Sequence, residues 1–125
     1  MQKNYNQFFK KKLENKIIAI TGSNGFISKH LIKELKYLKI KKLKVKEINS
    51  KNTNYFNYKS LEKSLKFADY VIHLSSATGG IKYTKENMSE QFYITMIKDL
   101  NVFKAAKKNK VKKLITIGNL HAYPK

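Results

Sequence analysis

Two glycine-bearing turns hold the residues of this chain whose types and spacing suit phosphate binding. The first is TGSNGFIS at residues 21–28, which lies between the apolar run 17–20 and an amphipathic helical pattern. Gly22 and Gly25, three residues apart, let the backbone turn tightly after a strand and approach a ligand closely. A helix that starts there offers unpaired amides and the positive end of its dipole to an anion. The segment therefore predicts a pyrophosphate site, provided that the surrounding elements form as expected.

A second turn, SSATGG at residues 75–80, follows another apolar run over residues 70–74. Its small side chains permit a ligand to pass close to the backbone, although turns of this kind are often only structural. Two glycine turns that meet at one edge of a sheet specify a nucleotide site far more closely than either turn does alone.

Apolar runs and helical patterns alternate along the chain, which predicts an α/β fold. The periodicity predicts strands at residues 16–21, 43–48, 55–56, 70–74 and 114–117, and helices over about 25–38, 60–67 and 86–109. Continuous apolar runs are typical of strands buried on both faces of a parallel sheet. Right-handed crossovers then give a doubly wound, Rossmann-like parallel sheet of five strands in the order 3-2-1-4-5, with ligand beyond the carboxyl ends of strands 1 and 4.

The sequence divides into two parts. Residues 1–15 are predicted to be a polar N-terminal arm, loosely held or folded as a short helix, and residues 16–125 to be one incomplete dinucleotide-binding domain. The last strand is expected to be an open edge, and the apolar face of the helix over residues 86–109 is expected to lack neighbours. Aggregation, self-association or pairing with a partner chain would follow.

The charge of the chain is strongly positive, with a formal net charge of +19. All 27 basic residues are lysine and they are spread along the whole sequence. The complete absence of the bidentate Arg fork argues against a specific nucleic-acid reader, because that fork is the usual group for recognising bases and phosphates. We therefore expect only nonspecific, salt-sensitive binding to polyanions.

Other features of the composition limit the classes of protein to which the chain can belong. The chain has no cysteine and three scattered histidines, so disulfides within it are excluded and a metal cluster is not expected. No apolar run approaches the ~20 residues of a membrane span, and the amino terminus lacks the apolar core of a signal peptide. The sequence therefore predicts a soluble cytoplasmic protein.

Four segments together resemble the extended short-chain dehydrogenase/reductase family, the NAD-dependent epimerases and dehydratases: IAITGSNGFIS, ADYVIHLSSA, NVFKAAKKNKVKKLITIG and the closing YPK. Within the family, SSATGGI and GNLHAYPK are most similar to the GDP-L-fucose synthases. The resemblance covers residues 16–125 and implies NAD or NADP as cofactor. It also implies a nucleotide-sugar substrate, with epimerisation and NADPH-dependent reduction of a GDP-4-keto-6-deoxy sugar, once the rest of the family's chain is supplied.

The resemblance implies a cofactor site residue by residue. The first turn would hold the pyrophosphate through Gly22, Asn24, Gly25 and the amides of Phe26 and Ile27, and Ser28 stands in place of the family's third glycine. In the second turn, Ser75, Ser76 and Ala77 would lie beside the ribose and diphosphate of the cofactor.

The resemblance leaves the choice between NAD and NADP open. Glu47 is a candidate acceptor for the ribose hydroxyls, which would favour NAD, but it is equally consistent with a solvated charge at a strand end. Lys46 and Lys51 flank it, and either lysine pointing at the 2′ position would favour NADP. Asn57 takes the place of the family's Asp near the adenine.

The catalytic residues of the family are only partly represented. Asn119 stands at the Ser/Thr position before Tyr123, and the Tyr-x-x-x-Lys helix that follows in the family does not occur in the sequence. His121 lies beside the expected nicotinamide but has no obvious acid-base partner, and His73 is expected to be a hydrogen-bonded core residue. The alternative to an enzyme part is a non-catalytic dinucleotide-binding or partner-binding module, as in a split or remnant protein.

Overall fold

The computed structural model of the chain describes residues 2–76 and 81–117. The predictions made for Ala77, Asn119, His121 and Tyr123 therefore lie outside the described residues. The strands are β1 (Ile17–Thr21), β2 (Lys44–Ile48), β3 (Tyr70–His73) and β4 (Lys113–Thr116). The helices are α1 (Gln2–Leu13), α2 (Phe26–Tyr37), α3 (Tyr58–Ser64), α4 (Ile81–Glu86) and α5 (Met88–Lys108).

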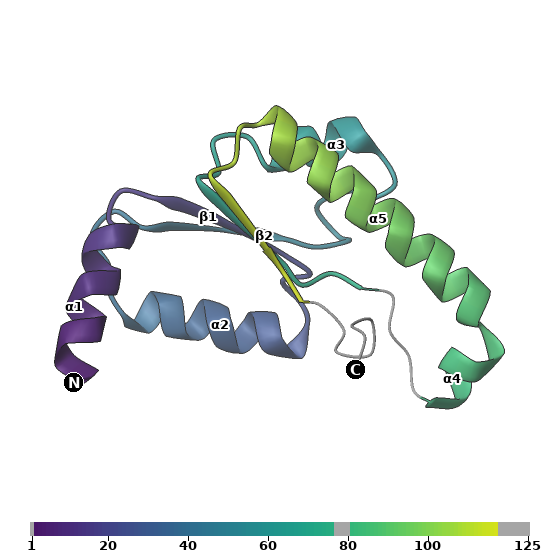
Figure 1. The fold of residues 1–125 in the computed structure, drawn as a ribbon, viewed down its shortest axis with the longest axis horizontal. Helices are drawn as coiled ribbons and strands as arrows, with labels where there is room; N and C mark the ends of the chain where they lie inside the picture. Colours follow the sequence, from purple (N-terminus) through teal and green to yellow (C-terminus); the bar gives the residue numbers. More distant parts are fainter. Residues whose placement is uncertain (1, 77–80, 118–125) are drawn as a thin grey trace, which may run out of the picture.

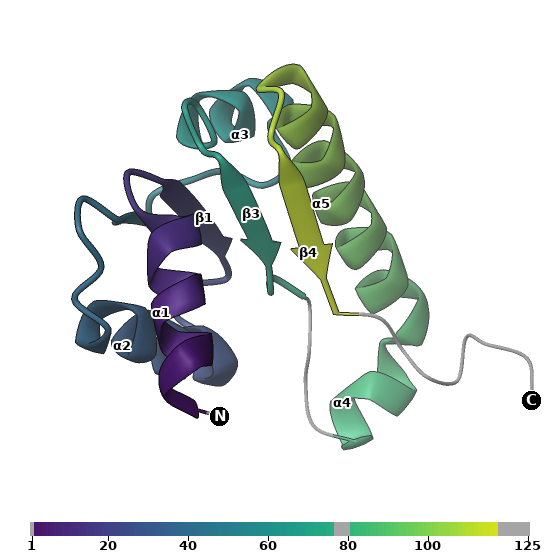
Figure 2. The same ribbon diagram turned by 60° about the vertical axis from the view of Figure 1, so that its left-hand side comes forward.

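The described strands form one parallel sheet in the order β2-β1-β3-β4, with helices on both faces. In Figure 1, α2 covers one face of the sheet, while α3 and α5 cover the other. Figure 2 shows β3 and β4 running in the same direction beside α5. This is the doubly wound, Rossmann-like fold expected from the alternation of strands and helices.

The central strand β1 separates the two layers of the core. Ile18 and Ile20 pack with residues of α2, whereas Ala19 packs with the buried residues of α3 and α5. This alternation follows from the two-residue period of a strand, and both faces are apolar because helices cover both. The continuous apolar run in the sequence therefore correctly predicted a central, doubly buried strand.

The prediction of a strand at residues 55–56 was wrong, so the sheet has four described strands instead of five. Tyr55 is buried, but it lies in a loop, where its ring joins the core and its hydroxyl bonds backbone groups. Burial of an aromatic side chain in a loop gives the same apolar signal as a short strand. The remaining strands keep the predicted order.

The prediction that the last strand is buried was also wrong. β4 forms the edge of the described sheet, and Ile115 within it is 49% exposed. Its continuous apolar residues are typical of a strand covered on both faces, whereas the described elements leave Ile115 half exposed. The accompanying prediction of an open edge was correct.

The long helix α5 packs on the sheet through one small part of its surface. Val102, Ala105 and Ala106 are buried against α3 and the core. Ile94 and Ile97 are half-buried, and six further apolar side chains are exposed: Met88, Phe92, Tyr93, Met96, Leu100 and Phe103. The predicted apolar face therefore exists and is mostly exposed, although Phe103 contacts the His73 ring edge-on at a centroid distance of 6.1 Å. The short helix α4 before it was not predicted.

The amino ends of the strands are tied together by Asp69, which precedes β3. Its carboxylate accepts a hydrogen bond from the Ile17 amide at 2.9 Å and from the Lys112 ammonium at 2.7 Å. The hydrogen bond from Lys112 is the main reason that the pKa of Asp69 is lowered. One side chain thus joins the starts of β1, β3 and β4, at the edge opposite the glycine turns.

Candidate functional site

The carboxyl ends of the strands lie in one row, which brings the loops that follow them together. Thr21 of β1 pairs with Ile48 of β2 and with His73 of β3, and His73 pairs with Thr116 of β4. The chain leaves β1 for β2 in one direction and β3 for β4 in the other, so the order reverses between β1 and β3. Ligands of doubly wound folds bind at this reversal.

The first glycine turn fits closely against the loop after β3. Gly22 has a φ of +68°, and a Cβ placed on it would lie 2.8 Å from backbone atoms of Leu74 and Ser75. The Gly25 amide donates to the Gly22 carbonyl at 2.9 Å, and Gly25 is the N-cap residue of α2. Glycine at position 22 is therefore required both by its backbone conformation and by lack of space.

The amino end of α2 is suited to an anion. The first amides of a helix have no acceptor within it, and Gly25 supplies no side-chain cap. Phe26 and Ile27, whose amides were predicted to hold the pyrophosphate, occupy this first turn with exposed side chains. Unpaired amides and the helix dipole together favour a phosphate group at this point.

Ser28, which replaces the family's third glycine, adds an unpaired donor beside the turn. Ser28 is 1% exposed, and its Oγ has no hydrogen-bond partner among the described residues. This oxygen lies 3.8 Å from the position that a Cβ on Gly25 would take. A buried hydroxyl without a partner is costly, and a ligand acceptor at the turn would remove that cost.

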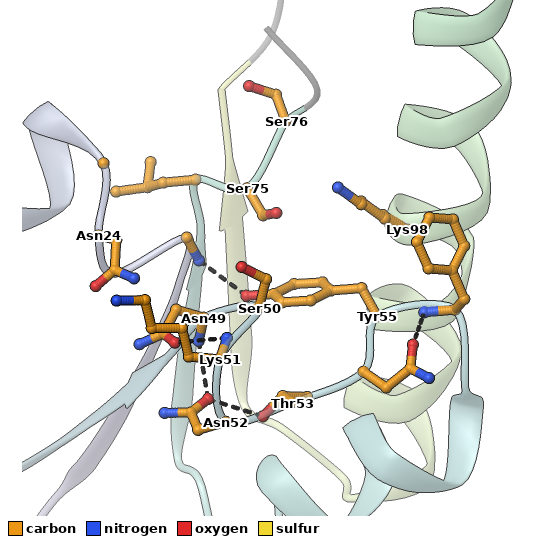
Figure 3. A pocket seen from close by; sticks show the side chains of 15 residues that line it. Asn24, Asn49, Ser50, Lys51, Asn52, Thr53, Tyr55, Ser75, Ser76 and Lys98 are labelled. Carbon is orange, nitrogen blue, oxygen red and sulfur yellow. Dashed lines mark hydrogen bonds between the residues drawn. The ribbon is translucent and has the colours of Figure 1, made fainter.

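The larger cavity at this edge has a volume of about 700 Å³. Figure 3 shows it between the glycine turn, the loop after β2, the start of the loop after β3, and α5. Its lining residues are Gly22, Asn24, Gly25, residues 49–56, Leu74, Ser75, Ser76 and Lys98. The structure therefore brings the two predicted turns together, and Gly22, Asn24, Gly25, Ser75 and Ser76 all line one cavity.

The loop after β2, which is rich in Asn, Ser and Thr over residues 49–54, contributes most of the lining. The Asn49 amide donates to Asn52 Oδ1 at 3.0 Å, and the Lys51 amide donates to Asn49 Oδ1 at 3.0 Å. Asn49 Nδ2 also donates to Ser23 Oγ at 3.0 Å, which joins this loop to the glycine turn. Asparagine side chains that accept hydrogen bonds from nearby backbone amides are typical of Asx turns. The sequence NSKNTN supplies the asparagines that such turns need.

Tyr55 links the same loop to the first turn. Its hydroxyl accepts from the Gly22 amide at 3.0 Å and donates to the Ile48 carbonyl at 3.0 Å. Burial raises the pKa of Tyr55, against the opposing effect of the Gly22 hydrogen bond. The hydroxyl therefore stays protonated and fixes the position of the turn.

Three charged or polar candidates for the adenosine end lie outside the lining of this cavity. Glu47 forms an ion pair with Lys36 at 2.8 Å, and the Lys46 ammonium donates to the Lys66 carbonyl at 3.0 Å. Asn57 is the N-cap of α3, because its side chain accepts from the Ser60 amide at 3.2 Å. Of the four residues Lys46, Glu47, Lys51 and Asn57, the structure places only Lys51 in the lining of this cavity.

A second cavity of about 510 Å³ lies on the other side of residues 74–76. Phe26, Ile27 and Ser28 line it together with His73 and Asp99. The His73 ring bonds Thr21 Oγ1 through Nδ1 and Asp99 Oδ1 through Nε2, the latter at 2.8 Å. The prediction that His73 is a hydrogen-bonded core residue is confirmed, and its bonds join β1, β3 and α5 at the crevice.

Comparison with known families matches residues 18–125 to the NAD dependent epimerase/dehydratase family. The chain belongs to this family. The matched residues contain both glycine turns, β2, β3, β4 and all of β1 except its first residue, Ile17. The cofactor is therefore NAD or NADP, and the cradle at Gly22 and the unpaired Ser28 hydroxyl fit its phosphates.

Solved structures show the same fold in longer chains. A structure described as DdhaC has a TM-score of 0.75 at 28% identity, and the match covers 88% of this chain and 32% of that one. A GDP-6-OMe-4-keto-L-xylo-heptose reductase from C. jejuni has a TM-score of 0.75 at 21% identity, covering 88% and 31%. A GDP-L-fucose synthetase from Naegleria fowleri bound to NADP has a TM-score of 0.68 at 23% identity, covering 82% and 30%.

The chain thus spans about a third of the length of these relatives. The comparison with curated proteins gave no match. Within residues 2–76 and 81–117, no cluster of three or more potential metal ligands occurs. No helix in the described part of the chain is long and apolar enough to cross a bilayer.

Proposed function

We propose that this chain is the cofactor-binding part of a nucleotide-sugar epimerase, dehydratase or reductase that resembles the GDP-L-fucose synthases. The observation that carries the proposal is the cavity at the reversal between β1 and β3, where both glycine turns meet. Bound there, the dinucleotide would supply hydride transfer at its nicotinamide. The residues of this chain bind its phosphates at the amino end of α2 and orient it between residues 21–28 and 74–76.

We further propose that the preferred cofactor is NADP. The carboxylate that would bind free ribose hydroxyls, Glu47, is paired with Lys36 and does not line the cavity. Lys51 does line it, in a loop held by the Asn49 and Asn52 side chains. A lysine in place of a carboxylate favours the 2′-phosphate over a 2′-hydroxyl.

Calorimetric titration with NADP and NAD tests both proposals. We expect binding of both, with NADP about tenfold tighter because of the charge-assisted contact to Lys51. Gly22→Val, which blocks the turn, should abolish binding of both cofactors. Lys51→Ala should remove the preference for NADP, whereas Lys41→Ala, at the opposite edge of the sheet, should keep it. Absence of heat with both cofactors would contradict the proposed binding function. Equal affinities for NAD and NADP would contradict only the proposed preference for NADP.

A second candidate function is a non-catalytic module that senses a dinucleotide or pairs with another chain. The observation that favours it is Asn119 at the family's Ser/Thr position, because an amide cannot exchange a proton as a hydroxyl can. Reading the coding DNA beyond Lys125 separates the two candidates. A continuing frame with a Tyr-x-x-x-Lys helix supports the enzyme, and a stop codon supports the module.

A further inference from the structure

Lys98 is a cationic residue of the larger cavity that no sequence motif indicates. It comes from α5, on the opposite side of the cavity from Lys51 in Figure 3, and its side chain is half-buried. Its Nζ lies 5.9 Å from the centroid of the Tyr55 ring and 5.7 Å from that of the Phe56 ring. The side chain thus lies over two aromatic rings that also line the cavity, and these contacts hold the ammonium there.

The charge of Lys98 has no carboxylate beside it in the cavity. The described lining contains two lysines and no acidic residue. The carboxylate next to Lys98 in the sequence, Asp99, bonds His73 Nε2 at 2.8 Å and lines the second cavity instead. The positive charge of Lys98 is therefore available to an anionic ligand in this cavity.

The direction of the Lys98 side chain indicates which part of the ligand it meets. In Figure 3 the ammonium points from α5 towards the side of Ser75 and Ser76. These serines line both cavities, together with Gly25 at the amino end of α2. A diphosphate at the first turn of α2 would therefore lie between the helix amides on one side and Lys98 on the other.

We propose that Lys98 binds the 5′-diphosphate of the dinucleotide, and this inference rests on the proposed cofactor-binding function. The glycine turn supplies neutral amide donors, and Lys98 supplies the positive charge that this turn lacks. The contact is common to NAD and NADP, so Lys98 strengthens the binding of both equally. Lys51, by contrast, separates the two cofactors.

The test compares Lys98 with a lysine of the same helix in a similar setting. Lys104 also lies over an aromatic ring, with its Nζ 4.6 Å from the Tyr58 centroid, but it does not line the cavity. We expect Lys98→Ala to weaken ADP, NAD and NADP by the same factor, about five- to tenfold. Adenosine, which carries no phosphate, should bind the variant as it binds the wild type. Lys104→Ala should leave all four affinities unchanged.

Two further variants separate lost charge from lost structure. Lys98→Met keeps the stem over the rings and should lose the same affinity as Lys98→Ala, while Lys98→Arg should retain most of it. Thermal melts should show that each variant folds. If the wild type binds NADP and Lys98→Ala binds it equally well, or if the loss is confined to ligands with a 2′-phosphate, the inference is overturned while the cofactor site stands. If the wild type binds no dinucleotide, the proposed function itself fails.

Discussion

The hydroxyl oxygen of Tyr55 lies 3.0 Å from the amide nitrogen of Gly22. This bond joins a loop residue after β2 to the first residue after β1, 33 positions earlier in the chain. The same hydroxyl donates to the Ile48 carbonyl, so it bridges the carboxyl ends of both strands. Tyr55 therefore lines the cavity and connects the glycine turn to the end of β2.

Tyr55→Phe removes this bridge with little change in packing. The half-buried Gly22 amide then loses its acceptor and the Ile48 carbonyl loses a buried donor, so we expect the free energy of unfolding to fall by about 1–3 kcal/mol. Urea denaturation measures the loss, with Tyr37→Phe as the control because Tyr37 is 78% exposed. Equal effects of the two substitutions would contradict the bridging role.

The raised pKa of Tyr55 also predicts a dependence on alkaline pH. Folding favours its neutral form, so this contribution to stability is complete below the unfolded pKa, near 10, and is lost as pH rises towards and through the folded value. The difference in urea midpoint between wild type and Tyr55→Phe should therefore shrink above about pH 10. A difference that stays constant to pH 11 would show that the hydroxyl does not titrate in this way.

Gly22→Ala should lower the free energy of unfolding more than Gly25→Ala does. At Gly22 the new Cβ meets backbone atoms at 2.8 Å and the φ is positive, whereas at Gly25 the nearest atom, the Gly22 carbonyl oxygen, is at 3.2 Å and the φ is −70°. The left-handed conformation alone costs about 1–2 kcal/mol for alanine. We expect a loss of about 2 kcal/mol or more at Gly22 and a smaller loss at Gly25. Thermal unfolding and NADP titration of the two variants measure both effects, and the reverse ranking would contradict the geometry.

Acid should weaken the contact between Asp69 and Lys112. The Lys112 ammonium lowers the pKa of Asp69 below its unfolded value, and the Ile17 amide contributes to the shift. A lowered folded pKa gives stability that is present above the unfolded value, near 3.9, and is lost as pH falls through the folded value. The stability difference between wild type and Asp69→Asn should therefore shrink from pH 6 to pH 3. Glu34→Gln, on the exposed face of α2, is the control, and a difference independent of pH would refute the linkage.

Two serines are expected to respond to alanine with opposite signs. Ser28 Oγ is buried and has no partner in the described part of the chain, whereas Ser64 Oγ lies 2.8 Å from Thr53 Oγ1. Ser28→Ala removes an unpaired group and should raise the free energy of unfolding by about 1 kcal/mol in the absence of cofactor. Ser64→Ala breaks a pair and should lower it. Urea midpoints of both variants measure these changes in stability. A loss of stability in Ser28→Ala would show that the Ser28 hydroxyl has a partner.

The strand order and the glycine turn after β1 could be predicted because local sequence patterns indicate them. The apolar run before Gly22 and the four- and three-residue spacing of apolar residues after Gly25 are properties of neighbouring residues. Gly22 itself was predictable because only glycine suits the turn. The same local reasoning gave the central position of β1, since a run without alternation requires cover on both faces.

The adenosine side of the site could not be predicted in the same way, because distant side chains decide it. Glu47 was a sound candidate by spacing, but Lys36 of α2 pairs with it. Asn57 lies at the start of a helix, where its oxygen caps an amide. Tyr55 was predicted to lie in a strand because a buried aromatic residue in a loop and an aromatic residue in a strand look alike in the sequence. Only the Asn-rich segment 49–54 carried a local sign of the loop that lines the cavity.

The exposed apolar face of α5 predicts self-association of this chain. Phe92 is 67% exposed and Leu100 is 57% exposed, and both belong to the unpartnered apolar side of the helix. Burying such surface is favourable by about 25 cal/mol per Å², so the face should associate despite the net charge of +19. The double variant Phe92→Gln, Leu100→Gln should shift the apparent mass in light scattering towards the monomer at micromolar concentration. Tyr37→Gln on α2 should leave the mass unchanged, because that side chain lies outside the face. A wild-type chain that stays monomeric at this concentration would refute the prediction.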